Sequence, residues 1–222
     1  MRRLLLVAVT GFVLAACGSS AATPGSSTTS SVPGSSTTSS GTTAGARCWP
    51  AAARTLGTSR AARVYVQSGA VYGCAAGSRG RYLLGHASVC INSDRVGPVA
   101  VAGRMAAYAV TTCGVDTGSA TVVVRRLSDG AHVFSHAAAD AAGPEGYVAV
   151  TTIVATPAGA VAWIAHATTI VGHRSVTGVY ARRGSGISKL DSGSGIGLSS
   201  LRLSGSTVSW EDGSGRRSSR LS

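Results

Sequence analysis

Pro157-Ala158-Gly159-Ala160-Val161-Ala162-Trp163 places a glycine turn directly before an apolar run that carries an aromatic residue. The same order recurs in Gly103-Arg104-Met105-Ala106-Ala107-Tyr108 and in Gly205-Ser206-Thr207-Val208-Ser209-Trp210. Tyr72, which follows Gly69, gives a shorter fourth copy. Each copy comes after another apolar run, so each predicts a turn and the second strand of an antiparallel pair. These repeats predict an all-β domain.

Short β-type runs fill the chain on both sides of these copies. They are rich in Val, Tyr, Thr and Ala, and Gly, Asp or Ser residues separate them, as in the hairpin signal Asp129-Gly130. A short helix is expected over residues 51–62, a helical turn over 137–142, and a polar loop that contains Asn92, Asp94 and Pro98. The expected strands span residues 63–67, 70–74, 82–84, 99–102, 105–112, 120–127, 132–136, 147–155, 160–167, 176–183, 187–190, 201–203, 207–211 and 216–221.

Matching positions in the copies recur every 36 to 57 residues, which brackets the ~40–50 residues of a propeller blade. The repeat resembles the β-propeller architecture, in which blades of up to four strands surround an axis. The resemblance implies that Tyr72, Tyr108, Trp163 and Trp210 pack between units. Because about four units are few for a closed ring, we expect an incomplete or small propeller-like array of antiparallel meanders. A β-sandwich is the alternative.

The N-terminus has the three parts of an export signal: Arg2 and Arg3, an apolar run over residues 4–14, and small residues before Cys17. An apolar run of this length is too short for a bilayer core, which needs ~20 residues. Leu14-Ala15-Ala16-Cys17 resembles the lipobox of bacterial lipoproteins. The resemblance implies cleavage before Cys17, a diacylglyceryl group on its thiol, and attachment to the outer face of the cell membrane. The alternative is an ordinary signal peptide that happens to contain a cysteine.

Residues 17–46 begin with the predicted lipidated Cys17 and continue with Ser, Thr, Gly, Ala and Pro, with Val32 as the only large apolar residue. Such a segment buries too little surface to offset the entropy of ordering, so it predicts a solvated tether. Stretched at ~3.3 Å per residue, it would span roughly 95 Å. Residues 47–222 are long enough for one domain with its own core.

Four cysteines follow Cys17, namely Cys48, Cys74, Cys90 and Cys113. An even number in an exported chain predicts two disulfides rather than thiol chemistry. No pair has the Cys-x-x-Cys spacing of redox or zinc sites. Three connectivities are open, and we favour Cys48 with Cys74 and Cys90 with Cys113. Free structural thiols are the alternative.

The chain is basic, with 19 Arg, one Lys (Lys189) and 8 acidic residues. Removal of the signal together with Arg2 and Arg3 leaves a net charge of +10. The arginines are dispersed in pairs such as Arg125-Arg126, without flanking aromatics, which disfavours specific nucleic-acid binding. The expected partners are the membrane, through the anchor, and an anionic envelope polymer or a protein. The excess of Arg over Lys indicates a GC-rich genome, and the chain resembles lipoproteins of high-GC Gram-positive bacteria.

No catalytic or metal-ligating set stands out in the sequence, and no cofactor is expected. His132 and His136 lie four apart in an expected strand without further ligands, which predicts a hydrogen-bonded or surface pair instead of a metal site. Gly193-Ser194-Gly195 has no expected helix after it, unlike a nucleophile elbow, and Glu211-Asp212 coincides with a hairpin turn. The sequence therefore predicts a membrane-anchored binding or scaffold module of the cell envelope without catalytic activity. The alternative is an envelope hydrolase whose site is built from distant loops.

Overall fold

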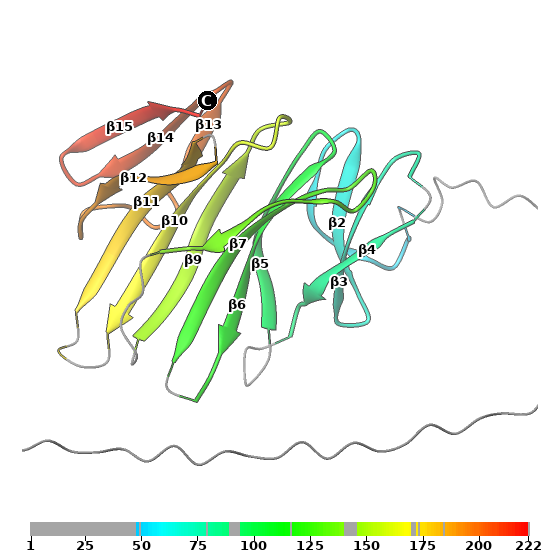
Figure 1. Ribbon diagram of the computed structural model, residues 1–222, viewed down its shortest axis with the longest axis horizontal. Coiled ribbons are helices and arrows are strands. Elements are labelled where there is room, and N and C mark those ends of the chain that lie inside the picture. The colour runs from blue at the N-terminus through cyan, green and yellow to red at the C-terminus, as the bar shows by residue number, and fades with distance from the viewer. Residues whose placement is uncertain are drawn as a thin grey trace, which may run out of the picture. The chain divides into compact units, whose positions relative to one another are not determined.

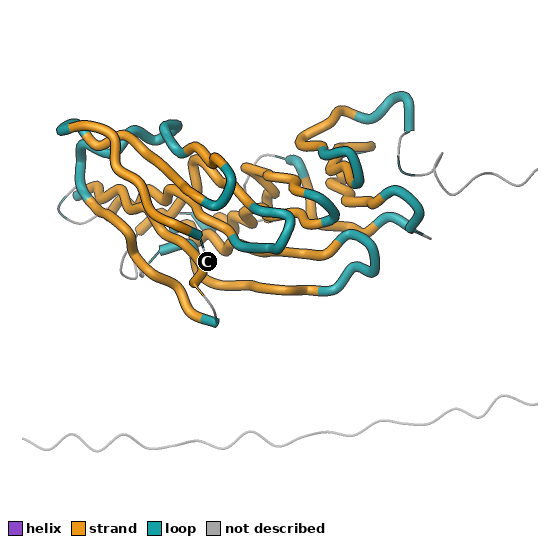
Figure 2. The backbone as a smooth tube through the Cα atoms, turned by 90° about the horizontal axis from the view of Figure 1, so that it is seen from above, coloured by secondary structure: helices purple, strands orange, loops and turns teal. Residues whose placement is uncertain are grey.

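The computed structural model of the chain (Figure 1) describes residues 48, 50–78, 80–88, 94–115, 117–139, 146–169, 172, 174–183 and 185–221. All of them lie in one compact unit, Gly41–Ser222. They form fifteen strands and no helix. Figure 2 shows the described backbone in the colours of strands and loops only. The all-β prediction is therefore confirmed. The predicted signal, the lipobox with Cys17 and the tether lie outside the described residues.

The first four strands form the N-terminal sheet, an antiparallel meander in the order β1-β2-β3-β4. A turn at Ser68 and Gly69, both with positive φ, joins β2 to β3 as the repeat predicts. The strands are β1 (Arg54–Thr58), β2 (Ala62–Gln67), β3 (Ala70–Ala75) and β4 (Tyr82–His86).

β1 shows that the helix expected over residues 51–62 is wrong. The alanines of this segment favour a helix, but two threonines and Gly57 within β1 disfavour one. Tertiary contacts then select the strand. Leu56 packs into the core, and Arg63 on β2 donates hydrogen bonds to the Thr55 hydroxyl at 2.8 Å and to the Ala53 carbonyl at 2.9 Å.

The middle of the domain is an eight-stranded sheet made of two antiparallel meanders, β5–β8 and β9–β12, which we call the second and third meanders. A parallel bridge between Gly118 and Tyr147 joins β7 to β9. The Tyr147 ring occupies the space of a Cβ atom on residue 118, so only glycine allows this approach. The strands are β5 (Asp94–Ala102), β6 (Met105–Cys113), β7 (Gly118–Arg126), β8 (His132–Ala137), β9 (Gly146–Ala155), β10 (Val161–Thr169), β11 (Ser175–Arg183) and β12 (Gly186–Ser192).

β5 begins at Asp94, so the polar loop expected there is wrong at both Asp94 and Pro98. The Thr112 hydroxyl of β6 donates to the Asp94 carboxylate at 2.7 Å, which secures the start of the strand. Pro98 lies where the β5–β6 register shifts, a position at which a sheet tolerates a residue without an N–H. Of the helical turn expected over residues 137–142, Ala137 belongs to β8, and residues 140–142 lie outside the described residues.

The last three strands form the C-terminal sheet, an antiparallel meander with one strand fewer than the others. Gly205, with a φ of 57°, turns the first strand into the second. The predicted hairpin at Asp212-Gly213 joins the second to the third. The strands are β13 (Arg202–Ser204), β14 (Thr207–Asp212) and β15 (Gly215–Arg220).

Successive meanders pack face to face, which explains the continuous apolar runs of their central strands. Along β6, Ala106 and Tyr108 pack with the N-terminal sheet, whereas Met105 and Ala107 pack with the third meander. Along β10, Trp163 packs with the second meander, and its neighbours on the strand pack with the C-terminal sheet. Side chains alternate across a strand. A strand buried on both faces therefore needs apolar residues at almost every position.

The aromatic residue of each of the three full copies packs against the preceding meander. Tyr108 packs against the N-terminal sheet, Trp163 against the second meander, and Trp210 against the third. Packing between units is thus confirmed for these three residues. The expectation is wrong for Tyr72, because this residue belongs to the first sheet and lies in a small core with two cysteines instead of between two units.

The first strands of the meanders lie beside one another: β5 packs against β1 and β9, and β9 also packs against β13. Within the described residues, the sheets do not close into a ring. The result is an open series with two end faces, the outer face of the N-terminal sheet and the outer face of the C-terminal sheet.

Candidate binding surfaces

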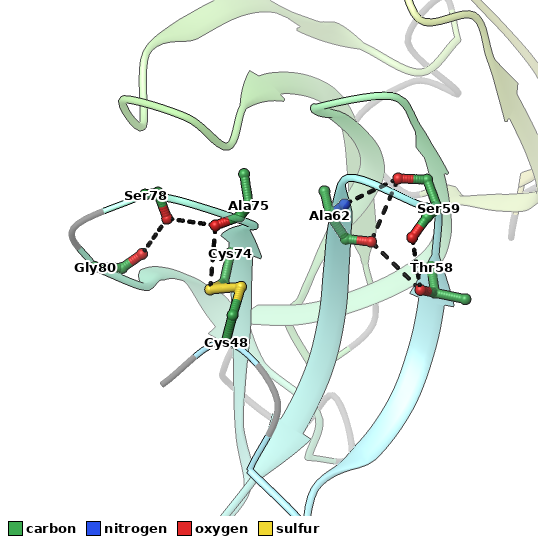
Figure 3. The surroundings of a disulfide bond; sticks show 8 residues. All are labelled: Cys48, Thr58, Ser59, Ala62, Cys74, Ala75, Ser78 and Gly80. Carbon is green, nitrogen blue, oxygen red and sulfur yellow. Dashed lines mark hydrogen bonds between the residues drawn. A yellow bond between two sulfur atoms is a disulfide. The ribbon is translucent and has the colours of Figure 1, made fainter. Parts of the chain in front are cut away.

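The predicted disulfide between Cys48 and Cys74 is present and covers the outer face of the N-terminal sheet (Figure 3). The two Cα atoms are 5.4 Å apart, and both residues are almost fully buried. Because Cys74 is on β3, the bond holds the start of the domain against that strand. Cys113 is also disulfide-bonded. Its expected partner Cys90 and the predicted lipidation site Cys17 lie outside the described residues.

The described residues contain no group of three or more His, Cys, Asp or Glu side chains that could hold a metal ion. His132 and His136 both lie on β8 and are exposed, as the predicted surface pair requires. The loop that contains Ser194 leads to β13 rather than to a helix. Asp212 is at the predicted hairpin and forms an ion pair with Arg217 at 2.8 Å.

Asp129 is likewise held by a turn. Its carboxylate accepts a hydrogen bond from the Ala131 backbone N–H at 3.0 Å and another from Arg126 at 2.8 Å. These bonds, the backbone one first, hold the pKa of the Asp129 carboxyl below its ordinary 3.8. The carboxyl is therefore ionised at neutral pH and unsuited to donate a proton there.

A row of hydroxyl and imidazole groups crosses β10 and β11. The Nδ1 atom of His166 is 3.1 Å from the Thr177 hydroxyl, and its Nε2 atom is 3.3 Å from the Thr168 hydroxyl. Thr168 in turn lies 3.4 Å from the Ser175 hydroxyl. A serine-protease-like triad places a carboxylate where Thr177 stands, because the imidazolium needs a negative charge. The row therefore links two strands and does not form a triad.

A pocket of about 420 Å³ opens between the outer strands of the second and third meanders. We call it the β8–β12 pocket. Strand β8 and the residues after it form one wall, and β11 and β12 form the other. Its lining residues are His136, Ala137, Ala139, Tyr180, Ile187 and Lys189.

The Tyr180 wall of the pocket is held in place from two sides. The Trp163 ring stacks on it with a centroid distance of 5.8 Å and an interplanar angle of 14°. Trp163 is fixed because its Nε1–H donates to the Ala138 carbonyl at 2.6 Å. The Tyr180 ring also fills the space that a Cβ atom on Gly178 would need. This wall is therefore preformed.

The rim of the pocket carries nitrogen groups. The Lys189 Nζ atom is 5.7 Å from the Tyr180 ring centroid. Across the pocket, the His136 ring stacks on Phe134 at 6.2 Å, and the Arg182 guanidinium lies 5.1 Å from the same Phe134 ring. No described lining residue is acidic.

The outer face of the C-terminal sheet is polar and basic. Because Leu203, Val208 and Trp210 pack against the third meander, the residues between them point away from it. We call this surface the basic face. Three arginines against one glutamate give it an excess of positive charge, and it carries no large apolar side chain. Its residues are Arg202, Ser204, Thr207, Ser209, Glu211, Arg216, Ser218 and Arg220.

The arginines of the C-terminal sheet differ in how they are held. Arg202 donates to two backbone carbonyls near the start of the sheet, at 2.7 and 2.9 Å. Arg217 points to the inner side, where Asp212 and Asp191 bind it. Arg216 and Arg220 are exposed and have no hydrogen-bond or ion-pair partner among the described residues. Their guanidinium groups face solvent.

A second hollow, of about 650 Å³, lies beside the β14–β15 hairpin. Both charge signs are present in it, and Glu211 and Arg216 also belong to the basic face. We therefore treat it as the margin of that face. Its lining residues are Gly195, Gly197, Glu211, Asp212, Gly213, Gly215 and Arg216.

Comparison with known protein families and with curated proteins finds no match to this chain. In the part of the chain that the structure describes, no helix has the length and hydrophobicity needed to cross a bilayer. Sequence reasoning missed both the pocket and the basic face. Their only signals are Lys189, the single lysine, and the alternation of arginines with small polar residues near the C-terminus.

Proposed function

We propose that the protein is a membrane-anchored, extracytoplasmic binding module for an anionic polymer of the cell envelope, without catalytic activity. The basic face carries the proposal, because Arg216 and Arg220 present exposed guanidinium groups that form no ion pair with a described residue, and the arginines of this face outnumber its single acid, Glu211. The alternative of an envelope hydrolase is favoured by no contact among the described residues.

The spacing of the basic face suits a ligand with repeated negative charges. Residues two apart on a strand are separated by ~6.7 Å, so Arg216 and Arg220 stand ~13 Å apart, with Ser218 between them. A guanidinium can bind phosphate or carboxylate through two parallel hydrogen bonds, and a serine hydroxyl adds a further donor. A polymer can meet both arginines at once, whereas a small ion meets one. The favoured ligand is therefore a chain of phosphate or carboxylate groups.

Polymer binding is tested with the full-length chain and immobilised poly(glycerol phosphate), with neutral dextran as the reference. We expect retention that falls with added salt, because the contacts are exposed charge pairs. The double substitution Arg216→Gln/Arg220→Gln should weaken retention several-fold. Arg54→Gln/Arg60→Gln removes the same charge from exposed positions around β1 and should change it little. Equal losses in both variants, or none in the first, would show that the basic face is not the site.

The anchor rests on the lipobox resemblance of Leu14-Ala15-Ala16-Cys17. One acyl chain binds a membrane marginally and two bind it firmly, so modification of Cys17 would fix the protein to the surface. Cys17→Ala should leave an unacylated precursor that moves out of the mature membrane fraction. An unchanged mass and an unchanged fractionation would contradict the anchor.

We also propose that the four meanders are blades of an incomplete β-propeller. Three observations support this: the meanders follow chain order, their first strands lie side by side, and the aromatic of each later copy packs on the preceding meander. A crystal structure with two sheets packed as a sandwich would contradict it.

A further inference from the structure

We propose that the outer edge of β15 binds an extended acidic segment of a partner protein, which pairs antiparallel to β15 as a fourth strand of the C-terminal sheet. This interaction goes beyond polymer binding, because it uses the backbone groups of the strand edge, whereas the polymer would contact side chains of the basic face. The proposal stands on the number of strands in the sheet, the direction of the backbone groups of β15 and the charge beside them.

The C-terminal sheet has one strand fewer than each of the other meanders. In those three, the third strand pairs with a fourth, as β3–β4, β7–β8 and β11–β12, and all three pairs are antiparallel. β15 is the third strand of its own sheet, and among the described residues it pairs only with β14. The edge that binds a fourth strand in every other meander is therefore unpaired here in the described part of the chain.

The unpaired edge presents the backbone groups of Arg216, Ser218 and Arg220. In an antiparallel pair, alternate residues direct both their N–H and their C=O to the partner strand. The Leu221 N–H donates to the Ser206 carbonyl at 2.8 Å, which fixes the alternation along β15. The three residues therefore direct their N–H and C=O away from β14, and all three are exposed. Such a row is a template for the addition of a strand.

The charge beside the edge selects an acidic partner. Arg216 and Arg220 are exposed and form no ion pair with a described residue. Opposite charges directly across two strands stabilise their pairing, and like charges destabilise it. An antiparallel second copy of β15 would place arginines opposite arginines. The segment ahead of the first strand has no acidic residue, since Asp94 is the first acid of the chain. Neither of these occupants therefore complements the edge.

The complete meanders show which pattern the added strand should have. On their fourth strands, Leu84, Phe134 and Ile187 pack into the cores. These strands are five to seven residues long. Because side chains alternate across a strand, every second residue of an added strand would lie on the basic face, beside the arginines. The favoured partner is therefore a segment of similar length in which acidic and apolar residues alternate.

Binding is tested with the full-length chain and the capped hexapeptide (Glu-Val)₃, measured by calorimetry. The references are (Gln-Val)₃, which is neutral, and (Lys-Val)₃, which is basic. We expect saturable binding of the acidic peptide that weakens with added salt, and clearly weaker binding of both references. No saturable binding of the acidic peptide would overturn the proposal. Equal binding of the neutral peptide would overturn the selection by charge.

Amide hydrogen exchange shows whether the peptide pairs with the backbone. In the free protein, the N–H groups of Arg216, Ser218 and Arg220 should exchange fast, whereas those of Arg217 and Ser219 bond to β14 and should exchange slowly. The peptide should slow the first three about tenfold or more, and poly(glycerol phosphate) should slow them far less. Fast exchange at saturation would overturn the pairing.

Slow exchange of the same three amides without peptide would also overturn the proposal. If it depends on protein concentration, a second copy occupies the edge. If it does not, another segment of the chain occupies it.

Methylation of backbone nitrogens in the peptide tests the geometry without any change to the protein. Opposite Arg216 and Arg220 in an antiparallel pair, glutamates direct their N–H to β15 and valines direct theirs away. Methylated glutamates should therefore weaken binding about tenfold or more, because hydrogen-bond donors are lost at the edge. Methylated valines are the matched control and should change it little. Equal losses would contradict strand pairing, and a loss with the valines alone would contradict the antiparallel direction.

Two variants separate the edge from the basic face. Ser218→Pro and Ser218→Ala both remove the hydroxyl, but only proline also removes the outward N–H, which an edge strand tolerates. Ser218→Pro should therefore weaken peptide binding about tenfold or more, whereas Ser218→Ala should change it little. Retention on poly(glycerol phosphate) depends on side chains, so the two variants should retain the polymer equally. Equal peptide binding by the two variants would overturn the role of the edge.

The two proposals have separate outcomes. Peptide binding can fail while the polymer is retained through the arginine side chains. Retention on the polymer can fail while the peptide still slows the exchange of the edge amides.

Discussion

The outer face of the N-terminal sheet is apolar and covered, whereas the outer face of the C-terminal sheet is polar and bare. Tyr65, Cys48 and Cys74 on the first face are 0%, 1% and 2% exposed. Two arginines add to this cover, Arg63 over the Tyr65 ring and Arg81 over the Tyr72 ring. The second face consists of arginine, serine, threonine and glutamate side chains.

The difference shows two ways to end an open series of sheets. Each unit of such a series buries its faces against its neighbours, so the terminal units need a different outer face. The N-terminal sheet repeats the aromatic position of the other units, as Tyr72, and covers it with a disulfide-linked segment. The C-terminal sheet buries its aromatic residue, Trp210, against the third meander and carries polar residues on its outer face. The bare end is the one that can bind a partner without rearrangement.

The largest effect should come from Trp210→Ala at the C-terminal end. Trp210 is 3% exposed, and its Nε1–H donates to the Asp191 carboxylate at 2.7 Å. Truncating a buried tryptophan costs ~3–5 kcal/mol. No described segment covers the outer face of the C-terminal sheet, so this sheet is held only through its inner face, where Trp210 packs. Hydrogen exchange should therefore show β13–β15 losing protection before β2 and β3. Ser209→Ala, on the opposite face of β14, is the control, and equal loss of protection at both ends would contradict the prediction.

A slightly smaller effect should come from removing the disulfide with Cys48→Ser/Cys74→Ser. The sequence separation of 26 residues corresponds to ~3–4 kcal/mol in the chain-entropy account of disulfides. Urea unfolding measures the change in the free energy of unfolding. Here the loss of hydrogen-exchange protection should begin at β2 and β3, the reverse of Trp210→Ala. If the hydrogen-exchange protection of these two strands is unaltered, the N-terminal sheet does not depend on the segment that the disulfide holds against it.

Tyr65→Phe should stabilise the covered end by about 1 kcal/mol. The Tyr65 hydroxyl is buried and has no hydrogen-bond partner in the described part of the chain, and an unsatisfied buried group costs ~1–3 kcal/mol. Tyr72→Phe, at a less buried ring of the same core, should change the unfolding free energy by less than ~0.5 kcal/mol. A loss of stability in Tyr65→Phe would show that the hydroxyl is satisfied.

The smallest effect on the free energy of unfolding should come from the ionisation of Tyr108, which packs against the N-terminal sheet. It should appear only at alkaline pH. Burial raises the pKa of Tyr108 above its ordinary 10.0, although the nearby Arg125 charge lowers it. The raised pKa means that the folded state favours the protonated phenol. Its contribution to stability is full below pH 10 and is lost as the pH rises through the folded pKa. The corresponding residue at the other end, Trp210, does not titrate.

Tyr108→Phe tests this difference. As the pH rises above 10, the free energy of unfolding should fall less in the variant than in the unaltered protein. At neutral pH the two proteins should have nearly equal free energies of unfolding. Urea unfolding across this range measures it. If the two proteins lose stability in parallel, other groups control the alkaline response.

Strand positions could be predicted from the sequence because strands buried on both faces leave long apolar runs, and turns leave glycines. Gly103, Gly159 and Gly205 do turn the first strand of a meander into the second, with positive φ. β1 escaped prediction because its alanine-rich surroundings favour a helix and only pairing with β2 selects a strand. The loop expected at Pro98 was wrong for a related reason. The register shift that accommodates this residue within β5 depends on pairing with β6.

The pocket and the basic face could not be predicted because they depend on packing between distant segments. His136 and Lys189 line the same pocket only because β8 and β12 border it. The basic face exists because the series of sheets ends at β13–β15. No local sequence pattern predicts that the series ends there. The pairing of Cys48 with Cys74 was predicted from the sequence, since Cys48 begins the expected domain and Cys74 ends its first expected strand pair.

The disulfide between Cys48 and Cys74 also decides how the domain would carry a mechanical load. A pull on the chain ahead of Cys48 passes through the sulfur atoms to β3, so β1 and β2 lie inside a covalent loop that the pull cannot extend. β3 is paired on both sides, with β2 and β4. The load therefore acts on many hydrogen bonds together instead of opening an edge strand one bond at a time. Such a domain would hold its shape under tension from the side on which the tether is predicted.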